Sequence, residues 1–256
     1  KQPVTFQPEL VLEGINAMGE QEGADEKLAL VRMAQLALGD VGSQGATAAV
    51  FEGYSTSRDL RPHQKMIGEV VERLERIYPT GEHKVDHELA RLIAMLEPES
   101  PLLLERLLGR MTDESSPTGD FHHLIVLARN RAARSSEQRR EIARALVQLR
   151  IKVDARHLNL DRNWDARLGE MYAGLVRHDP ALPQAVISEQ DFGLPDHLVY
   201  LKPLAAGDLQ PAIDRIVERI GESEDYPWTA EIIRLLGQSS REEHLQLLRK
   251  QAGNFG

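Results

Sequence analysis

Residues 62–96, PHQKMIGEVVERLERIYPTGEHKVDHELARLIAML, carry two apolar stripes with the spacing of α-helices. In the first stripe apolar side chains recur at i, i+3, i+4, i+7, i+10 and i+11, which places them on one helix face. The first stripe consists of Ile67, Val70, Val71, Leu74, Ile77 and Tyr78, and the second of Leu89, Leu92, Ile93 and Leu96. Gly81 is expected to end the first helix. The stretch therefore predicts a helical hairpin of Pro62 to Tyr78 with Asp86 to Leu96.

The same spacing continues along the chain and predicts further hairpins. They are Pro101 to Met111 with Phe121 to Asn130, and Ser136 to Arg156 with Asp161 to His178. The three hairpins start at Pro62, Ser100 and Ser135, which lie 38 and 35 residues apart. HEAT and armadillo repeats recur about every 40 residues, and each repeat buries its apolar stripe only against its neighbours. We expect an all-α fold of stacked antiparallel helical hairpins, a HEAT-like α-solenoid, with ordinary bundle packing as the alternative.

Polar residues with the chemistry of helix N-caps precede several of these helices. They are Ser100 before Pro101, Asp161, and the capping-box pairs Ser135 with Gln138 and Ser240 with Glu243. Each such residue can accept a hydrogen bond from an unpaired backbone N–H of the first helical turn. The caps therefore support the helix starts that the apolar stripes predict.

Two stretches interrupt the helical pattern. Residues 39–61 are rich in Gly, Ser and Thr and predict a loop-rich insertion, with a short helix around Ala46 to Phe51. Residues 190–208 contain two prolines and two glycines and predict a connection before the last helices. We expect a single helical-repeat domain over residues 1–256, with a subdivision near 190–208 as the alternative.

Composition limits the classes of function. The chain has no cysteine, which excludes disulfides, thiolate zinc sites, covalent c-type haem attachment and cysteine nucleophiles. A net charge of −9 disfavours binding to nucleic acid or anionic lipid. No run of 18 apolar residues is present, so we expect no transmembrane segment. No GxGxxG, Walker, GxSxG, HExxH or EF-hand motif occurs, so the sequence assigns no catalytic residue and no cofactor.

Two pairs of histidines are candidates for chemistry. His83 and His87, with Glu88, could chelate zinc from one helix face, but His83 lies at or outside the predicted helix start. We interpret both as surface histidines and assign no metal ligand. His122 and His123 are adjacent and point about 100° apart on a helix. We expect one of them to pack near the hairpin seam and the other to face solvent.

Basic residues cluster in one segment of the acidic chain. From Arg129 to Arg156 there are nine basic and three acidic residues, a local balance of +6. This asymmetry predicts either a docking face for an acidic protein or a solvated face whose arginines pair with acids of adjacent repeats. The residues of the predicted docking face are Arg131, Arg134, Arg139, Arg140 and Arg144.

Both tryptophans lie in short polar and aromatic clusters. Trp164 belongs to the cluster Asp161 to Arg167, and Trp228 follows Tyr226 and Pro227. Each cluster predicts a structural corner that is held by aromatic packing. The alternative for both is a surface that contacts a peptide or a sugar.

Four phrases resemble a known family. They are FHHLIVLARN at 121–130, DRNWDARLGEMYAGLVRHDPAL at 161–182, FGLPDH at 192–197 and DYPWTAEIIRLLG at 225–237. Together they resemble the HEAT-like region of large bacterial membrane-bound dehydrogenases that also carry a β-propeller and a c-type cytochrome domain. The resemblance implies a helical-repeat region and a periplasmic or cell-envelope location. This chain has no CxxCH haem motif and no strand-rich repeats, so no functional residue carries over.

These patterns favour a non-catalytic function. We expect a helical-repeat scaffold or protein-interaction domain that is a fragment of a larger multidomain protein. Its partners would be proteins or neighbouring domains of the same polypeptide. The alternatives are a carbohydrate- or peptide-binding module, for which Trp164 and Trp228 are the contact candidates, and an enzyme with a site in the concave groove.

Overall fold

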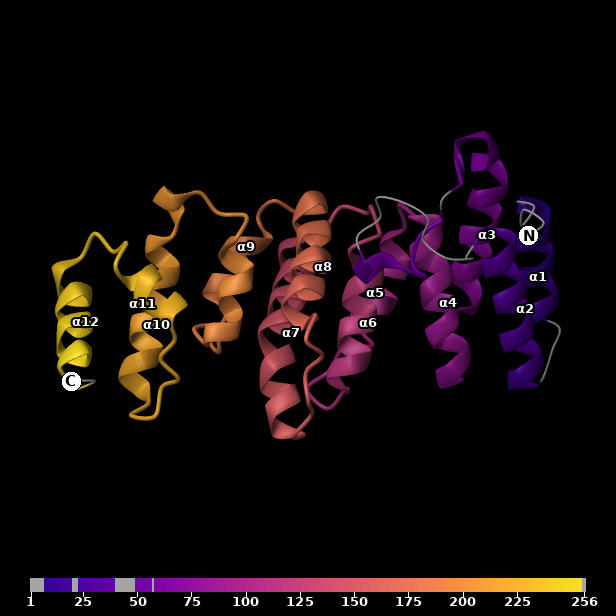
Figure 1. Cartoon of the computed structure of the whole chain (residues 1–256). Helices are drawn as coiled ribbons and strands as arrows, with labels where there is room; N and C mark the ends of the chain where they lie inside the picture. Colours follow the sequence, from indigo (N-terminus) through magenta and orange to yellow (C-terminus); the bar gives the residue numbers. More distant parts are fainter. Residues whose placement is uncertain (1–6, 20–22, 40–48, 57, 255–256) are drawn as a thin grey trace. The chain divides into compact units, whose positions relative to one another are not determined.

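The computed structural model describes residues 7–19, 23–39, 49–56 and 58–254, and its regular elements are helices (Figure 1). Within these ranges no strand forms, so the all-α prediction is confirmed. The residue types explain this result, because Leu, Ala, Glu and Arg are strong helix formers. Of the short helix predicted around Ala46 to Phe51, residues 46–48 lie outside the described residues, and Ala49–Phe51 form a 3₁₀-helix.

The helices keep close to the predicted bounds. In chain order the elements are α1 (Pro8–Met18), α2 (Ala24–Ala37), η1 (Ala49–Phe51), η2 (Arg61–His63), α3 (Gln64–Ile77), α4 (His83–Leu96), α5 (Pro101–Leu108), α6 (Pro117–Leu127), α7 (Ser136–Ala155), α8 (Trp164–His178), α9 (Leu182–Ser188), η3 (Pro195–Leu201), η4 (Ala206–Asp208), α10 (Gln210–Glu222), α11 (Ala230–Leu236) and α12 (Glu242–Asn254). The η elements are 3₁₀-helices.

The chain divides into two compact units. Unit 1 comprises residues 1–138 and 170–179, and unit 2 comprises residues 139–169 and 180–256. The division therefore falls within α7 and α8, whereas the sequence suggested 190–208 as the place for a subdivision. The expectation of a single helical-repeat domain stays a prediction.

In unit 1 the helices contact one another in two series. α1 packs against α3 and α3 against α5, while α2 packs against α4 and α4 against α6. The two series also touch, because α1 contacts α2, α3 contacts α4, and α5 contacts α6. Consecutive helices that the sequence pairs, α3 with α4 and α5 with α6, are therefore in contact.

The core of unit 1 is centred on α4, which contacts α2, α3 and α6. Its fully buried residues include Val85, Leu89, Leu92 and Ile93. α3 is covered on one side only, so that Val70 and Leu74 are fully buried while Ile67 and Val71 stay half-buried. The two half-buried residues line part of a groove.

Two of the predicted caps are present. Ser100 Oγ accepts a hydrogen bond from Leu103 N at 3.1 Å. Ser135 Oγ accepts from Gln138 N at 3.1 Å, and Gln138 Oε1 accepts from Ser135 N at 3.0 Å, which completes a capping box.

The other two predicted caps are wrong, because each helix starts later than expected. α12 begins at Glu242, and Ser240 Oγ instead donates to Gln210 Oε1 at 3.0 Å. α8 begins at Trp164, and Asp161 Oδ1 accepts from Asn163 N at 2.8 Å in the turn before it. Asp161 therefore stabilises the turn before α8, and Ser240 ties the segment before α12 to the start of α10.

In unit 2 the segment predicted as a connection, 190–208, is largely packed. Phe192 is fully buried, and Tyr200 of η3 is 2% exposed. Tyr200 Oη donates to Leu146 O at 2.8 Å, which ties η3 to the backbone of α7. Tyr226 Oη donates to Gly193 O at 2.7 Å. Residues 192–201 are therefore part of the core of unit 2, whereas most of residues 202–208 are exposed.

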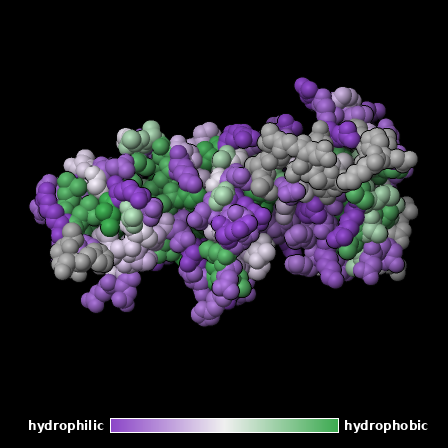
Figure 2. Space-filling model, viewed as in Figure 1, coloured by the Kyte–Doolittle hydropathy of each residue, from purple (hydrophilic) through white to green (hydrophobic). Residues whose placement is uncertain are grey.

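Exposed apolar residues are dispersed over the described surface. Polar and apolar residues are interspersed on the face shown in Figure 2. The large exposed apolar residues are Met33, Leu36, Leu102, Leu158 and Ile233. Of the helices in the described ranges, none has the length and apolar composition needed to cross a membrane.

Candidate functional site

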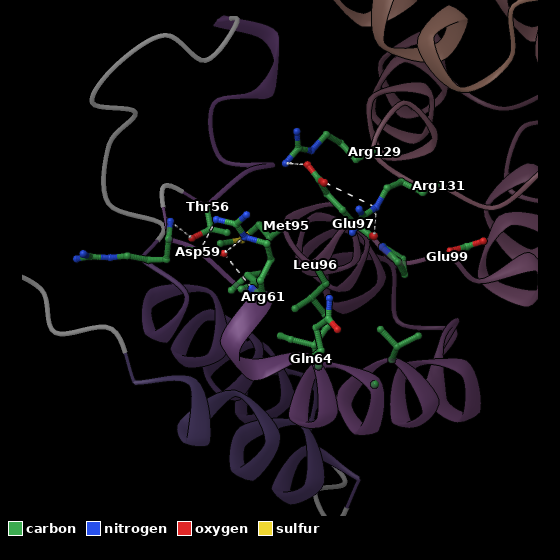
Figure 3. Close-up of a pocket in the computed structure, with 16 residues that line it drawn as sticks. Thr56, Asp59, Arg61, Gln64, Met95, Leu96, Glu97, Glu99, Arg129 and Arg131 are labelled. Atoms are coloured by element: carbon green, nitrogen blue, oxygen red, sulfur yellow. Dashed lines mark hydrogen bonds and ion pairs between the residues drawn. The ribbon is translucent and has the colours of Figure 1, made fainter.

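A groove of about 670 Å³ opens on unit 1 (Figure 3). Three parts of the chain line it: the segment from Thr56 through the start of α3, the end of α4 with the turn to α5, and the segment after α6. These parts lie 24 to 75 residues apart in sequence and meet only through the packing of α3, α4 and α6.

The floor of the groove is apolar. Ile67 and Val71 lie one helical turn apart on α3, and both are half-buried. Met95 and Leu96 at the end of α4 are buried beside them, as is Pro98 in the following turn. Covering the half-buried side chains would stabilise a complex by about 25 cal/mol for each Å² of apolar surface removed from water.

One rim of the groove is built around Glu97. Figure 3 shows this residue between Arg129 and Arg131. Glu97 follows α4 with a left-handed backbone, φ 48°, which ends the helix. Its Oε1 lies 2.5 Å from Arg129 Nη2, and its carbonyl accepts from Arg131 Nε at 2.9 Å. Burial lowers the pKa of Arg129, and the attraction of Glu97 opposes that shift.

The opposite rim holds an exposed ion pair. Arg61 donates from Nε and Nη2 to the two carboxylate oxygens of Asp59, at 2.9 Å and 2.8 Å. These hydrogen bonds lower the pKa of Asp59 to about 2. Both side chains are largely exposed, so the pair can open for a ligand at little cost.

The groove has the chemistry of a binding surface. Four arginines and three acidic residues line it, together with the apolar floor. The lining residues that the structure describes include no histidine, serine or lysine, and the hydroxyl of Thr56 donates to Leu38 O. The arrangement can hold an extended chain with both apolar and charged side chains.

The five arginines of the predicted docking face are divided between the two units. Arg131 and Arg134 belong to unit 1, and Arg139, Arg140 and Arg144 belong to unit 2. Arg131 lines the groove, and its side chain is 56% exposed. As a common docking face the set stays a prediction.

Arg134 has a structural role at the end of α6. Its Nη2 donates to Leu127 O at 2.7 Å and to Asn130 O at 3.1 Å, so it satisfies carbonyls that the helix leaves unpaired. Burial lowers its pKa, and the attraction of Asp179 opposes that shift. Its position is inside the packing and not on an open face.

On α7, Arg140 and Arg144 lie one turn apart and both are exposed. Arg144 Nε lies 4.0 Å from Glu189 Oε2, a distance at the limit of an ion pair. Arg139 on the same helix is half-buried. Unit 2 therefore presents two of the predicted cations on one helix face.

Both tryptophans of unit 2 are half-buried. The ring of Trp228 meets Tyr226 edge-on, with centroids 5.9 Å apart and an interplanar angle of 78°. Trp164 is the first residue of α8. Each keeps part of its ring accessible, so contact with a peptide or a sugar stays a prediction for both.

His83 is exposed and the side chain of His87 is 42% exposed, so both lie at the surface, but His87 is not isolated there. Its ring is half-buried and stacks on His122, with centroids 3.7 Å apart and an interplanar angle of 11°. His122 is the buried member of the adjacent pair, and His123 is half-buried rather than open to solvent. The local sequence pattern did not predict this cluster, because the histidines come together only where α4 packs against α6. In the described part of the chain, no three His, Asp or Glu residues are placed to hold a metal ion.

A second cluster, in unit 2, combines the residue types of a hydrolase triad. Ser239 Oγ lies 2.9 Å from His244 Nδ1, and His244 Nε2 lies 3.9 Å from Asp214 Oδ1. Ser239 is 9% exposed, however, and its Oγ accepts from Arg241 N at 3.1 Å. Ser239 therefore stabilises the turn before α12, and we interpret the cluster as structural.

Comparisons of the chain with protein-family models, curated proteins and solved structures found no match. The resemblance to the helical region of the dehydrogenases therefore stays a prediction.

Proposed function

We propose that this chain is a non-catalytic protein-interaction scaffold whose groove on unit 1 binds an extended, acidic segment of a partner protein. The observation that carries the proposal is an apolar floor flanked by arginines in a chain that is otherwise acidic. Apolar side chains of the segment would cover Ile67 and Val71, and its carboxylates would meet the arginines of the rim.

Charge complementarity selects an acidic occupant. The lining carries a formal charge of +1, from four arginines and three acids, against −9 for the whole chain. An acidic segment is thus repelled by most of the surface and attracted at the groove, which favours one docking position.

Arg131 is the best-placed cation for a carboxylate. Both of its side-chain contacts, to the carbonyl and to Oε2 of Glu97, use Nε, the latter at 3.9 Å. The terminal nitrogens Nη1 and Nη2 are therefore available to bind a carboxylate side by side. Arg129 is less available because it pairs closely with Glu97.

The helix contacts of unit 1 support a HEAT-like arrangement. Contacts of α1 with α3 and α5 with α3, and of α2 with α4 and α6 with α4, are those expected of stacked two-helix repeats. Such stacks present extended surfaces to protein segments, which is the use proposed for the groove. The scaffold role rests on the groove and does not require the exact repeat class.

Selection from a library of displayed random dodecapeptides tests the proposal. We expect the selected peptides to be enriched in Asp and Glu next to Leu, Ile or Phe. We also expect that the Arg131→Glu variant does not bind these peptides. Arg140→Glu makes the same charge change at an exposed site outside the groove and serves as the matched control. Enriched peptides without acidic residues, or peptides retained equally by Arg131→Glu, would contradict the proposed function.

A further inference from the structure

The carboxylate of Glu97 lies between two arginines on one rim of the groove (Figure 3). Its Oε1 is 2.5 Å from Arg129 Nη2, and its Oε2 is 3.9 Å from Arg131 Nε. A carboxylate of a partner protein would use contacts of the same kind, because guanidinium N–H groups are the donors that arginine offers to carboxylates. Glu97 therefore occupies, from within the chain, a position that an acidic ligand could otherwise take.

The backbone of Glu97 is unusual for a residue with a side chain. It follows α4 with φ 48°, a left-handed conformation that glycine adopts without steric cost and other residues do not. The hydrogen bonds of this turn use the backbone of Glu97: its N donates to Ala94 O at 3.3 Å, and its O accepts from Arg131 Nε at 2.9 Å. The carboxylate takes no part in these bonds, so its effect must be sought at the arginines that it contacts.

Arg129 is held by contacts that do not involve Glu97. Its guanidinium carbon lies 5.6 Å from the centre of the Phe51 ring, and its Nε donates to a carbonyl of α4 at 3.5 Å. Burial lowers the pKa of Arg129, and repulsion from Arg177 and Arg131 adds to that shift. The side chain lines the groove and is 17% exposed, so it is not sealed from a ligand. Without the Glu97 carboxylate, Nη2 of a positioned guanidinium would be left for an anion from outside.

Glu97 also places a negative charge where an acidic partner approaches. Arg131, whose terminal nitrogens are available, can bind one carboxylate of an extended segment. Acidic residues two positions apart lie on the same face of an extended chain. A second carboxylate would therefore meet the charge of Glu97 instead of an available guanidinium, and like charges repel.

We infer that Glu97 sets the specificity of the groove: it limits this rim to a single carboxylate and excludes runs of acidic residues. The inference rests on the proposed function, because it concerns the same groove and the same kind of segment. The preferred ligand is an apolar segment with one acidic residue directed at Arg131. Removal of the Glu97 carboxylate converts Arg129 into a second carboxylate site, so that segments with two acidic residues bind more tightly.

Fluorescence anisotropy with a selected peptide that has one acidic residue tests the inference. Two further peptides carry a second acidic residue, two positions before or after the first. For wild-type protein we expect the second acidic residue to change the affinity less than about twofold, and for Glu97→Gln protein we expect one of the two peptides to bind at least about fivefold more tightly. A fivefold gain on wild-type protein would overturn the inference.

Glu99→Gln is the matched control. It removes the same charge from the same groove, from an exposed side chain that lies to one side of the two arginines in Figure 3. A general charge effect would strengthen binding of the second acidic residue alike in both variants, whereas direct contact with Arg129 predicts the gain for Glu97→Gln alone. Equal gains in the two variants would overturn the inference.

Glu97→Gly provides a second variant, because it removes the whole side chain and suits the left-handed backbone. It should show the same gain for a second acidic residue as Glu97→Gln. Weaker binding of all three peptides by folded Glu97→Gly protein would mean that Glu97 only braces the arginines, and would overturn the inference.

Guanidinium ¹H–¹⁵N spectra separate this inference from the proposed function. Sulfate, compared with sodium chloride of equal ionic strength, should shift the Nε–H signal of Arg129 in Glu97→Gln protein but not in wild-type protein. Equal shifts in the two proteins would overturn the inference, whatever the peptides do. If no acidic peptide bound wild-type protein while sulfate shifted Arg129 in Glu97→Gln alone, the proposed function would fail and the role of Glu97 at Arg129 would be supported.

Discussion

His122 in unit 1 and His197 in unit 2 are both buried histidines, yet their surroundings differ. His197 Nδ1 accepts from Gly193 N at 3.1 Å and from Leu194 N at 3.2 Å, and its Nε2 donates to Val147 O at 3.2 Å. His122 has one hydrogen bond, to Tyr54, and a buried Nε2 without a partner. A buried histidine whose nitrogens are both paired stabilises the fold, whereas one with an unpaired nitrogen contributes less, because no hydrogen bond offsets the desolvation of that nitrogen.

Acid should destabilise both units, which is the largest effect expected. Burial lowers the pKa of His122 to about 2 and that of His197 to about 4, below the value near 6.5 of an unfolded chain. Between these values the unfolded state binds more protons, so stability is present above pH 6.5 and is lost as the pH falls. Each of the two histidines should lower the free energy of unfolding by about 2 kcal/mol at pH 5 relative to pH 8.

Urea unfolding measures this effect. Stability that is unchanged between pH 8 and pH 5 would show that the two rings are not held neutral by burial.

The same substitution at the two histidines should have unequal effects. His197→Phe leaves two backbone N–H groups and one carbonyl without their partner, which should lower the free energy of unfolding by about 3 kcal/mol. His122→Phe removes one partner of Tyr54 and keeps the aromatic stack, and should cost about 1 kcal/mol. Equal losses in chemical denaturation would remove the distinction between the two sites.

The smallest stability effect concerns the ring that covers His122. His87→Ala removes a stacked aromatic partner and should lower the free energy of unfolding by about 1 kcal/mol. His83→Ala, one turn earlier and exposed, should change it by less than about 0.5 kcal/mol. Thermal denaturation of the two variants side by side measures the difference. A neutral His87→Ala would show that the stack on His122 does not stabilise the fold.

The helices of unit 1 were predictable from sequence because their stripes are local. Ile67 to Tyr78 and Leu89 to Leu96 give the period of α3 and α4 without any tertiary information. Segment 190–208 was not predictable, because Pro195, a residue that usually marks a loop, here starts the 3₁₀-helix η3, whose Tyr200 enters the core.

The candidate sites were predictable only in part. The excess of basic residues after Arg129 indicated Arg131. Nothing local indicated Glu97, because a left-handed backbone is uncommon for glutamate, nor the stack of His87 on His122, which are 35 residues apart. Sites that form where distant segments meet carry no signal in the local spacing of residues.

The central claim is that the groove of unit 1 binds an acidic segment through Arg131. Fluorescence anisotropy of one selected acidic peptide, titrated with wild-type, Arg131→Glu and Arg140→Glu protein, tests it most directly. We predict that Arg131→Glu weakens binding at least tenfold, about 1.4 kcal/mol, and that Arg140→Glu changes it less than about twofold. Equal affinities for wild-type and Arg131→Glu protein, or equal losses in both variants, would contradict the account.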